Sequence, residues 1–474
     1  MTQLHDLTAL EQAAAVRAGE TGPVELVEHA LRRIEALDGG LGAFLTVTPD
    51  RALAAARRAE HRRARGGELP PLLGVPTAIK DLNNTAGVRT TFGSALFADN
   101  VAAVDDAVVT KLAAAGTISV GKTNTPEFGF PCYTDNALAG PARCPWDRAR
   151  LAGGSSGGAA VAVAAGMLPV AQGSDGGGSI RIPASINGLY GIKPSRGRVS
   201  NAPLGGDVTG LGTNGPIART VRDAAALLDA MAGPVLGDAT WAPPLPPGET
   251  FLGAADRPVG RLRIGRHLES PMPDAVLDPD VQAALDDATT LLTGLGHEVE
   301  DVPGGLLGPD VLAAFERAWT LSGTLLPVPP ERAHELRPLT RELRSRGLAL
   351  SAQAAMEALT ALRLFSRRFL HATRRFDVLV APVTTMTPRP LGWFDADGDG
   401  AADFERQKRY AAFTAVFNVT GQPAVSVPLH WTPEGLPVGT MLVGRPADEA
   451  TLVALSAQLE AARPWAHRHP PGWA

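Results

Sequence analysis

The segment between residues 153 and 183 constrains the fold of this chain more than any other. It reads GGSSGGAAVAVAAGMLPVAQGSDGGGSIRIP, with two glycine- and serine-rich clusters at 153–158 and 176–179. A helix over 156–166 would advance about 16 Å at 1.5 Å per residue. A strand over 168–172 would return roughly the same distance at 3.3 Å per residue. The path therefore runs out and back, and it predicts that Ser155 and Ser179 meet at one end.

The composition of the two clusters indicates a reaction site. Glycine lets the backbone approach a ligand closely and present its N–H groups. Consecutive N–H groups at Gly177, Gly178 and Ser179 would stabilise the negative oxygen of a tetrahedral intermediate. A glycine-rich tight turn without chemistry is the alternative, and it explains one such cluster better than two joined in this way.

The use of lysine is a second clue. Only five of the 44 basic residues are lysines, namely Lys80, Lys111, Lys122, Lys193 and Lys408. Arginine cannot lose its proton in a protein, whereas a buried lysine can. Lys80 ends the apolar run LLGVPTAI, where burial would favour the uncharged amine, a competent base. The alternative for Lys80 is a salt bridge to the adjacent Asp81.

Hydrophobic patterning along the rest of the chain alternates between strands and helices, which predicts an α/β core with helices on both sheet faces. A Pro- and Gly-rich connector is expected over 233–260. Helices are expected twice in the first 40 residues and over 105–115, 280–295, 310–372 and 449–462. Strands are expected over 72–79, 117–120, 261–265, 298–302, 376–383 and 423–429.

Composition and charge exclude several classes of function. The net charge is −5, which argues against a nucleic-acid-binding or anionic-membrane surface. The most apolar stretch, 159–171, is shorter than the roughly 18 residues of a membrane span. Cys132 and Cys144 are too few for a disulfide framework, and the first residues lack the pattern of a signal peptide. We expect a cytoplasmic protein, a monomer or homodimer, without a metal or other cofactor.

At this point the residues resemble the amidase signature family. The resemblance covers almost the whole chain and is weakest between about 236 and 374. It is carried by these blocks: GVPTAIKD from Gly74, GKTNTPEFG from Gly121, GGSSGG from Gly153, GSDGGGSIRIPA from Gly173, GIKPSRGR from Gly191, GPIART from Gly215, GQPAVSVP from Gly421 and GLPVG from Gly435.

The resemblance implies one domain over 1–474, with a mixed twisted β-sheet between layers of helices. Its core would cover about 60–235 and 375–474, and 236–374 would form a variable helical portion over the pocket. The implied function is amide hydrolysis on a small-molecule substrate.

The family's Ser-Ser-Lys triad falls on three residues of this chain. It implies that Lys80 is the base, that Ser155 is the bridging serine after a cis peptide, and that Ser179 is the nucleophile. Residues Gly176, Gly177, Gly178 and Ser179 would form the oxyanion hole. The resemblance also implies hydrogen bonds that hold this loop, made by Ser156, Asp175 and Arg181.

This sequence departs from the family's pattern near the triad. Leu151-Ala152 stands where Arg/Thr-Pro is common, Gly176 replaces the usual aliphatic residue, and Asn187 replaces a small one. The departures bear on substrate preference and not on the triad.

Six residues are predicted to line the substrate pocket, mostly with apolar or aromatic side chains: Pro131, Tyr133, Trp319, Leu325, Phe417 and Asn418. They favour neutral, apolar or aryl amides, with tolerance for carbamates, esters and amide oligomers. The main alternative is a glutamine amidotransferase component that supplies ammonia to a tRNA-dependent partner. A non-catalytic binding module is a second alternative, and retention of all three triad residues argues against it.

Several short patterns point elsewhere and are weaker. The segment 116–123 fits a phosphate-binding loop, but its middle residues read as a strand. The segment 153–157 fits G-x-S-x-G without an apolar strand before it. The segment 395–403 resembles the start of a calcium loop, but Arg406 occupies the twelfth position, where glutamate is needed. His467 and His469 could bind a metal, but a flexible tail is the more natural interpretation.

Overall fold

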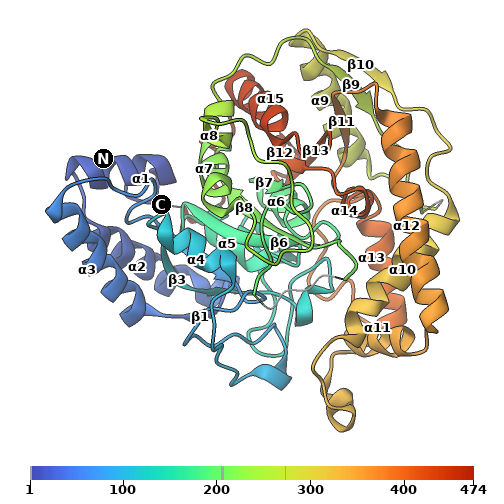
Figure 1. Ribbon diagram of the computed structural model, residues 1–474, viewed down its shortest axis with the longest axis horizontal. Coiled ribbons are helices and arrows are strands. Elements are labelled where there is room, and N and C mark those ends of the chain that lie inside the picture. Colours follow the sequence, from blue (N-terminus) through green and yellow to red (C-terminus); the bar gives the residue numbers. More distant parts are fainter. Residues whose placement is uncertain (1–2, 204–207, 273, 474) are drawn as a thin grey trace.

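An eight-stranded mixed sheet forms the centre of the structure, a computed structural model that describes residues 3–203, 208–272 and 274–473 (Figure 1). Its strand order is β10-β9-β11-β13-β12-β7-β8-β6. The strands β9, β10 and β11 run parallel, and the remaining neighbours pair antiparallel. The strand bounds are β6 Val170–Asp175, β7 Tyr190–Lys193, β8 Thr213–Ala218, β9 Arg263–Arg266, β10 Glu298–Asp301, β11 Val378–Pro382, β12 Ala424–Trp431 and β13 Pro437–Gly444.

A three-stranded sheet adjoins the β6 edge of the large one. Its order is β1-β3-β2, with bounds β1 Phe44–Val47, β3 Ile118–Thr123 and β2 Pro76–Lys80. The Lys80 backbone N–H donates to the side chain of Gln172 at 2.8 Å, so β2 lies against β6. A further pair joins β4 (Arg143–Cys144) to β5 (Asp147–Leu151).

Side chains alternate between the two faces of the large sheet, and both faces are buried. On β11, Val378 and Val380 join one apolar cluster, whereas Leu379 and Ala381 join another. Helices α7 (Val221–Met231), α9 (Pro279–Gly294) and α15 (Glu449–Ala462) cover the first face. The second is covered by α6 (Arg181–Asn187), α10 (Pro309–Thr324), α12 (Ala352–Thr373) and α14 (Ala415–Thr420). The predicted mixed sheet between helices is thus confirmed.

The amino-terminal helices form a separate layer beside the small sheet, in blue in Figure 1. These are α1 (Ala9–Ala18), α2 (Pro23–Leu41) and α3 (Pro49–Arg65). Apolar residues of all three meet the strands β2 and β3 in one cluster with helix α5 (Gly157–Ala164). The remaining helices are α4 Ala107–Ala114, α8 Phe251–Ala254, α11 Pro338–Leu348 and α13 Gly400–Tyr410.

Most predicted elements are present with shifted ends, but three strands of the large sheet escaped the sequence analysis. These are β7, β8 and β13, each of which contains a glycine. Pro216 also interrupts β8, so neither run shows the usual alternation of a strand. Helices α3 and α7 were also missed.

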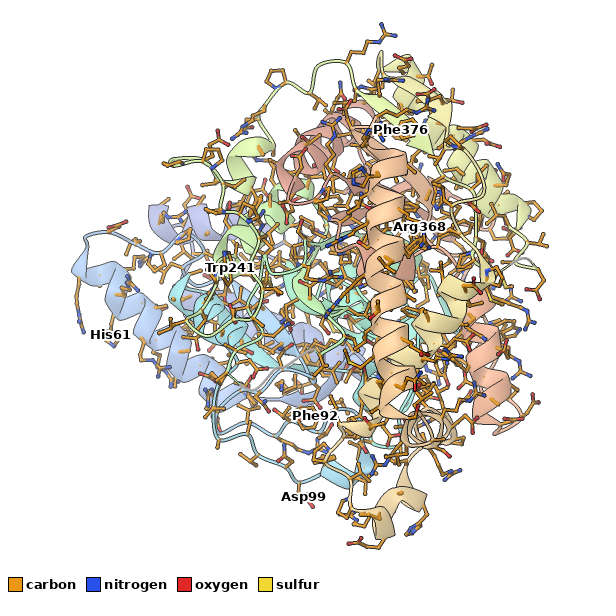
Figure 2. The ribbon with its side chains drawn as sticks, turned by 45° about the vertical axis from the view of Figure 1, so that its right-hand side comes forward. His61, Phe92, Asp99, Trp241, Arg368 and Phe376 are labelled. Atoms are coloured by element: carbon orange, nitrogen blue, oxygen red, sulfur yellow. The ribbon has the colours of Figure 1, made fainter. Side chains whose placement is uncertain are left out.

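The segment expected to be variable, 236–374, is only partly helical. Its strands β9 and β10 extend the large sheet, so the segment is continuous with the core there. Its helices α10, α11 and α12 stand beside the site described below, and α12, with Arg368, comes to the front in Figure 2. No helix within the described residues is both long and apolar enough to span a membrane.

Candidate active site

Lys80 ends strand β2 and is completely buried. Its Nζ lies 2.7 Å from Ser155 Oγ, 3.1 Å from Ser174 Oγ and 3.3 Å from the Ser174 carbonyl oxygen. Burial lowers the pKa of Lys80 to about 7, although the Asp175 carboxylate acts in the opposite direction. An amine with this pKa is partly uncharged at neutral pH and can accept a proton from Ser155.

The alternative for Lys80, a salt bridge to Asp81, does not form because another lysine takes that partner. Lys122 Nζ lies 3.2 Å from Asp81 Oδ1, and both side chains are buried. Lys122 also donates to the Asn83 carbonyl and the Thr90 hydroxyl, each at 2.7 Å. Lys122 lies inside strand β3 and has protein partners, so segment 116–123 does not form a phosphate-binding loop.

The two glycine- and serine-rich clusters meet, as the out-and-back path predicts. Helix α5 leads away from the first cluster and strand β6 returns to the second. The Ser156 N–H then donates to the Ser179 carbonyl at 3.1 Å. Ser156 Oγ donates to the Ser174 carbonyl at 3.1 Å and accepts from the Ser174 N–H at 3.2 Å. The peptide bond before Ser155 is cis, as the resemblance implies.

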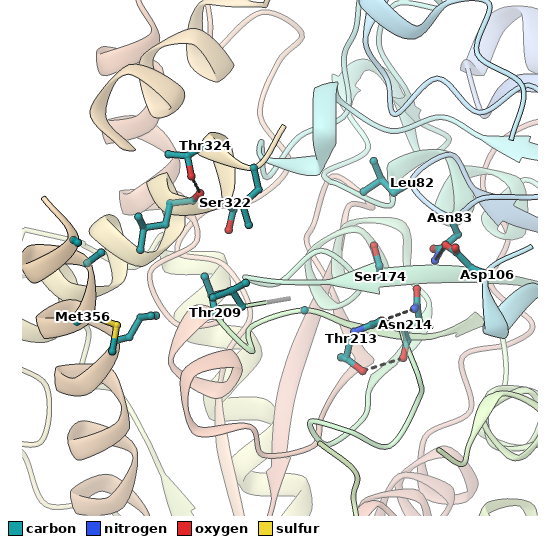
Figure 3. A pocket seen from close by; sticks show the side chains of 18 residues that line it. Leu82, Asn83, Asp106, Ser174, Thr209, Thr213, Asn214, Ser322, Thr324 and Met356 are labelled. Atoms are coloured by element: carbon teal, nitrogen blue, oxygen red, sulfur yellow. Dashed lines mark hydrogen bonds between the residues drawn. The ribbon is translucent and has the colours of Figure 1, made fainter. Parts of the chain in front are cut away.

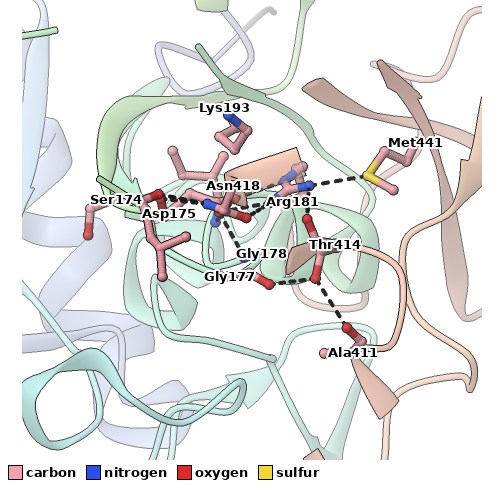
Figure 4. A network of polar contacts seen from close by, with 12 residues as sticks. Ser174, Asp175, Gly177, Gly178, Arg181, Lys193, Ala411, Thr414, Asn418 and Met441 are labelled. Carbon is pink, nitrogen blue, oxygen red and sulfur yellow. Dashed lines mark hydrogen bonds and ion pairs between the residues drawn. The ribbon is translucent and has the colours of Figure 1, made fainter. Parts of the chain in front are cut away.

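A buried ion pair holds the turn between β6 and α6 (Figure 4). Arg181 binds both oxygens of Asp175 at 2.9 and 3.0 Å, and neither side chain is exposed. Burial alone would raise the pKa of Asp175, but the Arg181 guanidinium outweighs it and holds that pKa well below its usual range. Asn418 Nδ2 donates to Asp175 Oδ1 at 2.9 Å, and Thr414 Oγ1 donates to the Gly177 carbonyl at 2.5 Å. The turn is therefore fixed from β6, α6 and α14 together.

The same carboxylate changes the expected oxyanion hole. The Gly178 N–H donates to Asp175 Oδ1 at 2.7 Å, so it is engaged inside the turn and does not point to a substrate. Gly178 has φ 132, in the region that favours glycine, and this conformation turns its N–H toward Asp175. Gly176, Gly177 and Ser179 remain as candidate donors.

A small cavity of about 70 Å³ opens beside Ser179. Its walls are mostly aromatic and apolar, with a few polar groups: Phe130, Cys132, Gly177, Ser179, Ile182, Phe315, Trp319, Phe404, Gln407, Lys408, Ala411 and Ala415. Lys408 Nζ lies 2.5 Å from both Glu316 and Glu405, so its charge is balanced locally.

A larger cavity of about 660 Å³ reaches the site from another direction (Figure 3). Ser174, Asn83 and Asn214 supply polar groups on the side of the core, whereas Leu325 and Met356 belong to its apolar side. Because Ser174 Oγ contacts Lys80 Nζ, this cavity comes within one side chain of the buried lysine.

The six predicted wall residues are distributed over different places. Trp319 lines the cavity at Ser179, Leu325 lines the larger one, and Pro131 and Tyr133 line a third, of about 290 Å³, together with Arg337.

Two of these predictions need correction. Phe417 is fully buried in the core and packs against Phe369, and Asn418 is bound to Asp175. Both belong to α14, which packs into the apolar core against α12 and so supports the turn instead of facing a substrate.

Sequence reasoning missed several residues of the site. Ser174 had a usable signal, because it stands directly before Asp175 at the end of a strand that leads to Ser179. Lys408 had another, because it is one of only five lysines. Phe130, Phe315, Phe404 and Gln407 carry no distinguishing local pattern, since only the packing of distant elements brings them to the cavity.

The patterns that suggested metal sites have other roles. Asp399 caps the start of α13, and Asp397 pairs with Arg406. His469 stacks on Trp473 at 3.9 Å between ring centroids. Across residues 3–203, 208–272 and 274–473, no three His, Cys, Asp or Glu side chains gather in a way that could hold a metal ion.

Comparison with known proteins places this geometry in a family. The family model described as Amidase matches residues 25–453. A Mycobacterium tuberculosis chain named "Putative amidase AmiB2" is 42% identical over 480 residues, covering 99% of each chain. A solved structure of 6-aminohexanoate cyclic dimer hydrolase has a TM-score of 0.91 and 32% identity, and the match covers 100% of both chains.

A solved component of the glutamyl-tRNA(Gln) amidotransferase from Thermotoga maritima is also similar, with a TM-score of 0.77 and 27% identity. That match covers 98% of this chain and 96% of the other. The family match and the hydrolase relatives extend over nearly the whole chain. The chain therefore belongs to the amidase family and is an amidohydrolase that acts on carbon–nitrogen bonds.

Proposed function

We propose that this amidohydrolase works through a Ser-Ser-Lys triad and an acyl-enzyme, with Ser179 as nucleophile, Ser155 as bridge and Lys80 as base. The observation that carries the proposal is the buried Lys80 amine, with a pKa of about 7, at 2.7 Å from Ser155 Oγ. The contact between Ser156 N–H and the Ser179 carbonyl supports it, because it joins the two serine clusters at this amine.

The reaction follows from these positions. Ser179 gives its proton to Ser155, which passes its own proton to Lys80, and Ser179 Oγ bonds to the substrate's carbonyl carbon. The carbonyl oxygen becomes negative and accepts hydrogen bonds from N–H groups of Gly176, Gly177 and Ser179. The C–N bond then breaks as Ser155 returns a proton to the leaving nitrogen. Water, deprotonated by the same relay, finally releases the acyl group as a carboxylic acid.

The proton path also assigns the two ends of the substrate. The leaving nitrogen must face Ser155, and therefore the side of Lys80 and Ser174, where the larger cavity opens. The acyl group then occupies the aromatic cavity at Ser179. Those walls contain one cation, Lys408, which Glu316 and Glu405 already balance.

These walls favour neutral, apolar or aryl acyl groups. Burying a charged acyl substituent there would cost free energy without a partner to offset it. Related carbamates, esters and small amide oligomers present the same carbonyl to Ser179. The relative named as a cyclic amide dimer hydrolase supports inclusion of amide oligomers.

The amidotransferase alternative has less support. The solved hydrolase matches this fold with a TM-score of 0.91, against 0.77 for the amidotransferase component. We further propose a cytoplasmic enzyme acting without nucleic acid, supported by the net charge of −5 and by two buried cysteines that are not in a disulfide. A monomer or homodimer stays a prediction.

A substrate panel tests the proposal on the purified chain alone. It compares acyl anilides, aliphatic amides, linear and cyclic amide oligomers, aryl carbamates and glutamine, with Ser179→Ala as the background control. We expect kcat/KM for an acyl anilide at least about ten times that for glutamine, a difference of about 1.4 kcal/mol. Efficient glutamine hydrolysis without anilide turnover would contradict this substrate class and favour the amidotransferase function.

A further inference from the structure

Gly176 is a glycine that the backbone does not require. Its φ lies outside the left-handed region, in contrast to Gly178 with φ 132. Any residue could adopt this conformation. The family that this chain resembles usually carries an aliphatic side chain after the aspartate, so the reason for glycine here must lie in the space around it.

That space is occupied by the indole of Trp319. A Cβ atom placed on Gly176 would lie 3.4 Å from Trp319 Cζ3 and 3.5 Å from Cη2, and within 4 Å it would meet no other atom. A Cβ on Gly177 would also face the same ring edge, at 3.7 Å. A methyl group would therefore just fit at position 176. A β-branched side chain fills two of the three positions around Cβ and would push against the ring.

The indole is held in this place by other aromatic residues. Trp319 stacks on Phe315, one turn earlier on α10, with 5.7 Å between centroids and 21° between planes. Phe130 meets it edge-to-face at 5.8 Å and 80°. Trp319 is half-buried and lines the cavity that contains Ser179. The ring can thus meet a substrate group without rearrangement.

We propose that Gly176 and Trp319 form a matched pair that selects flat, apolar acyl groups, such as benzoyl. Gly176 keeps the loop at Ser179 free of side-chain atoms, and Trp319 uses that space to present a fixed aromatic wall beside the acyl carbonyl. A planar acyl group packs on such a wall in the offset or edge-to-face geometry that aromatic pairs prefer. This inference rests on the proposed function, because it assumes that the acyl group lies in the cavity at Ser179.

A double-mutant cycle tests the pair with two substrates that share one leaving group, the para-nitroanilides of benzoic and butyric acid. Gly176→Thr is expected to lower kcat/KM for the benzoyl substrate at least about tenfold, and for the butyryl substrate less than about threefold. Gly176→Ala should give a smaller loss than Gly176→Thr. In a Trp319→Ala background, Gly176→Thr should change the benzoyl value less than about threefold, because the obstructing ring is gone.

The matched control is Arg317→Ala, a truncation on the exposed side of the same helix, which should leave the benzoyl-to-butyryl ratio of the parent unchanged. An equal loss from Gly176→Thr in both backgrounds would mean that it damages the oxyanion loop itself, and would overturn the pairing. An unchanged benzoyl-to-butyryl ratio in Trp319→Ala would overturn the selectivity. A parent enzyme that cleaves neither anilide would contradict the proposed function, whereas an active parent with additive effects would contradict the pair alone.

Discussion

Lys80 shows how burial without a carboxylate partner changes the chemistry of a single side chain. An ammonium group in a protein interior costs several kcal/mol, and the uncharged amine avoids most of that cost. The contacts of Lys80 are with the two serines, Ser155 and Ser174, and not with Asp81. Its low pKa therefore follows from its place at the end of β2.

Replacement of Lys80 by arginine separates its proton from its charge. Lys80→Arg is expected to lose about a thousandfold in kcat, nearly as much as Lys80→Ala, because a guanidinium cannot accept a proton. Steady-state kinetics on an acyl anilide measures both. Substantial activity in the arginine variant would show that Lys80 serves as a structural cation.

The pH profile of the parent enzyme gives an independent test of Lys80. The amine is protonated below its pKa of about 7, so the rate should fall as the pH decreases through that value. The sign is set by the base being the uncharged form, which predominates above the pKa. A rate that stays level from pH 8 to pH 5, or that rises as the pH falls, would exclude an uncharged Lys80 as the base.

The residue scale also shows where sequence reasoning ends. Lys80, Ser155 and Ser179 stand in distinctive local patterns, and their positions could be inferred from those patterns. Phe417 and Asn418 were predicted to face the substrate, although a local segment does not determine which side of a short helix is buried. Their burial against α12 and Asp175 depends on contacts between segments far apart in the chain.

At the scale of elements, the turn between β6 and α6 is the part on which the site depends most. Asp175 ends β6, Arg181 begins α6 and Asn418 comes from α14, so three elements are joined at one carboxylate. This carboxylate also takes the N–H of Gly178 and of Ile180. The shape of the turn at Ser179 is thus determined by a polar network below it.

Removal of the charge on Asp175 tests the importance of that network for stability. Asp175→Asn leaves the fully buried Arg181 without a counter-charge, and the expected loss in free energy of unfolding is about 3–5 kcal/mol. The control, Asp256→Asn, breaks an ion pair with Arg222 whose side chains are 67% and 46% exposed, and should cost less than about 1 kcal/mol. Urea denaturation measures both, and equal losses would contradict the structural role of the Asp175–Arg181 pair.

Elements whose patterning is interrupted were the hardest to predict. The strands β7, β8 and β13 lie within the large sheet although they contain glycine or proline. A Cβ on Gly215 would lie 2.2 Å from the Ile192 carbonyl, and one on Gly439 would lie 2.4 Å from Ser426 Oγ. Close packing across strands therefore requires these glycines, and that requirement cannot be seen in a local sequence window.

Over the whole molecule, the site combines a locally encoded centre with walls assembled at long range. The large sheet, the small sheet and the out-and-back path bring Lys80 to the two serine clusters. The cavity walls come from α10 and α13, whose position beside the turn depends on packing across more than a hundred residues of chain. For this reason the reaction could be predicted from the sequence more fully than the substrate.

The most direct test of the account is to locate the nucleophile. The purified enzyme is treated with a fluorophosphonate that reacts with activated serines, and peptide mass spectrometry identifies the modified residue. We expect the adduct on Ser179, none in a folded Ser179→Ala variant, and slow labelling in Lys80→Arg, where the relay lacks its base. An adduct on another serine, or continued amide hydrolysis by Ser179→Ala, would contradict the assignment of Ser179 as the nucleophile.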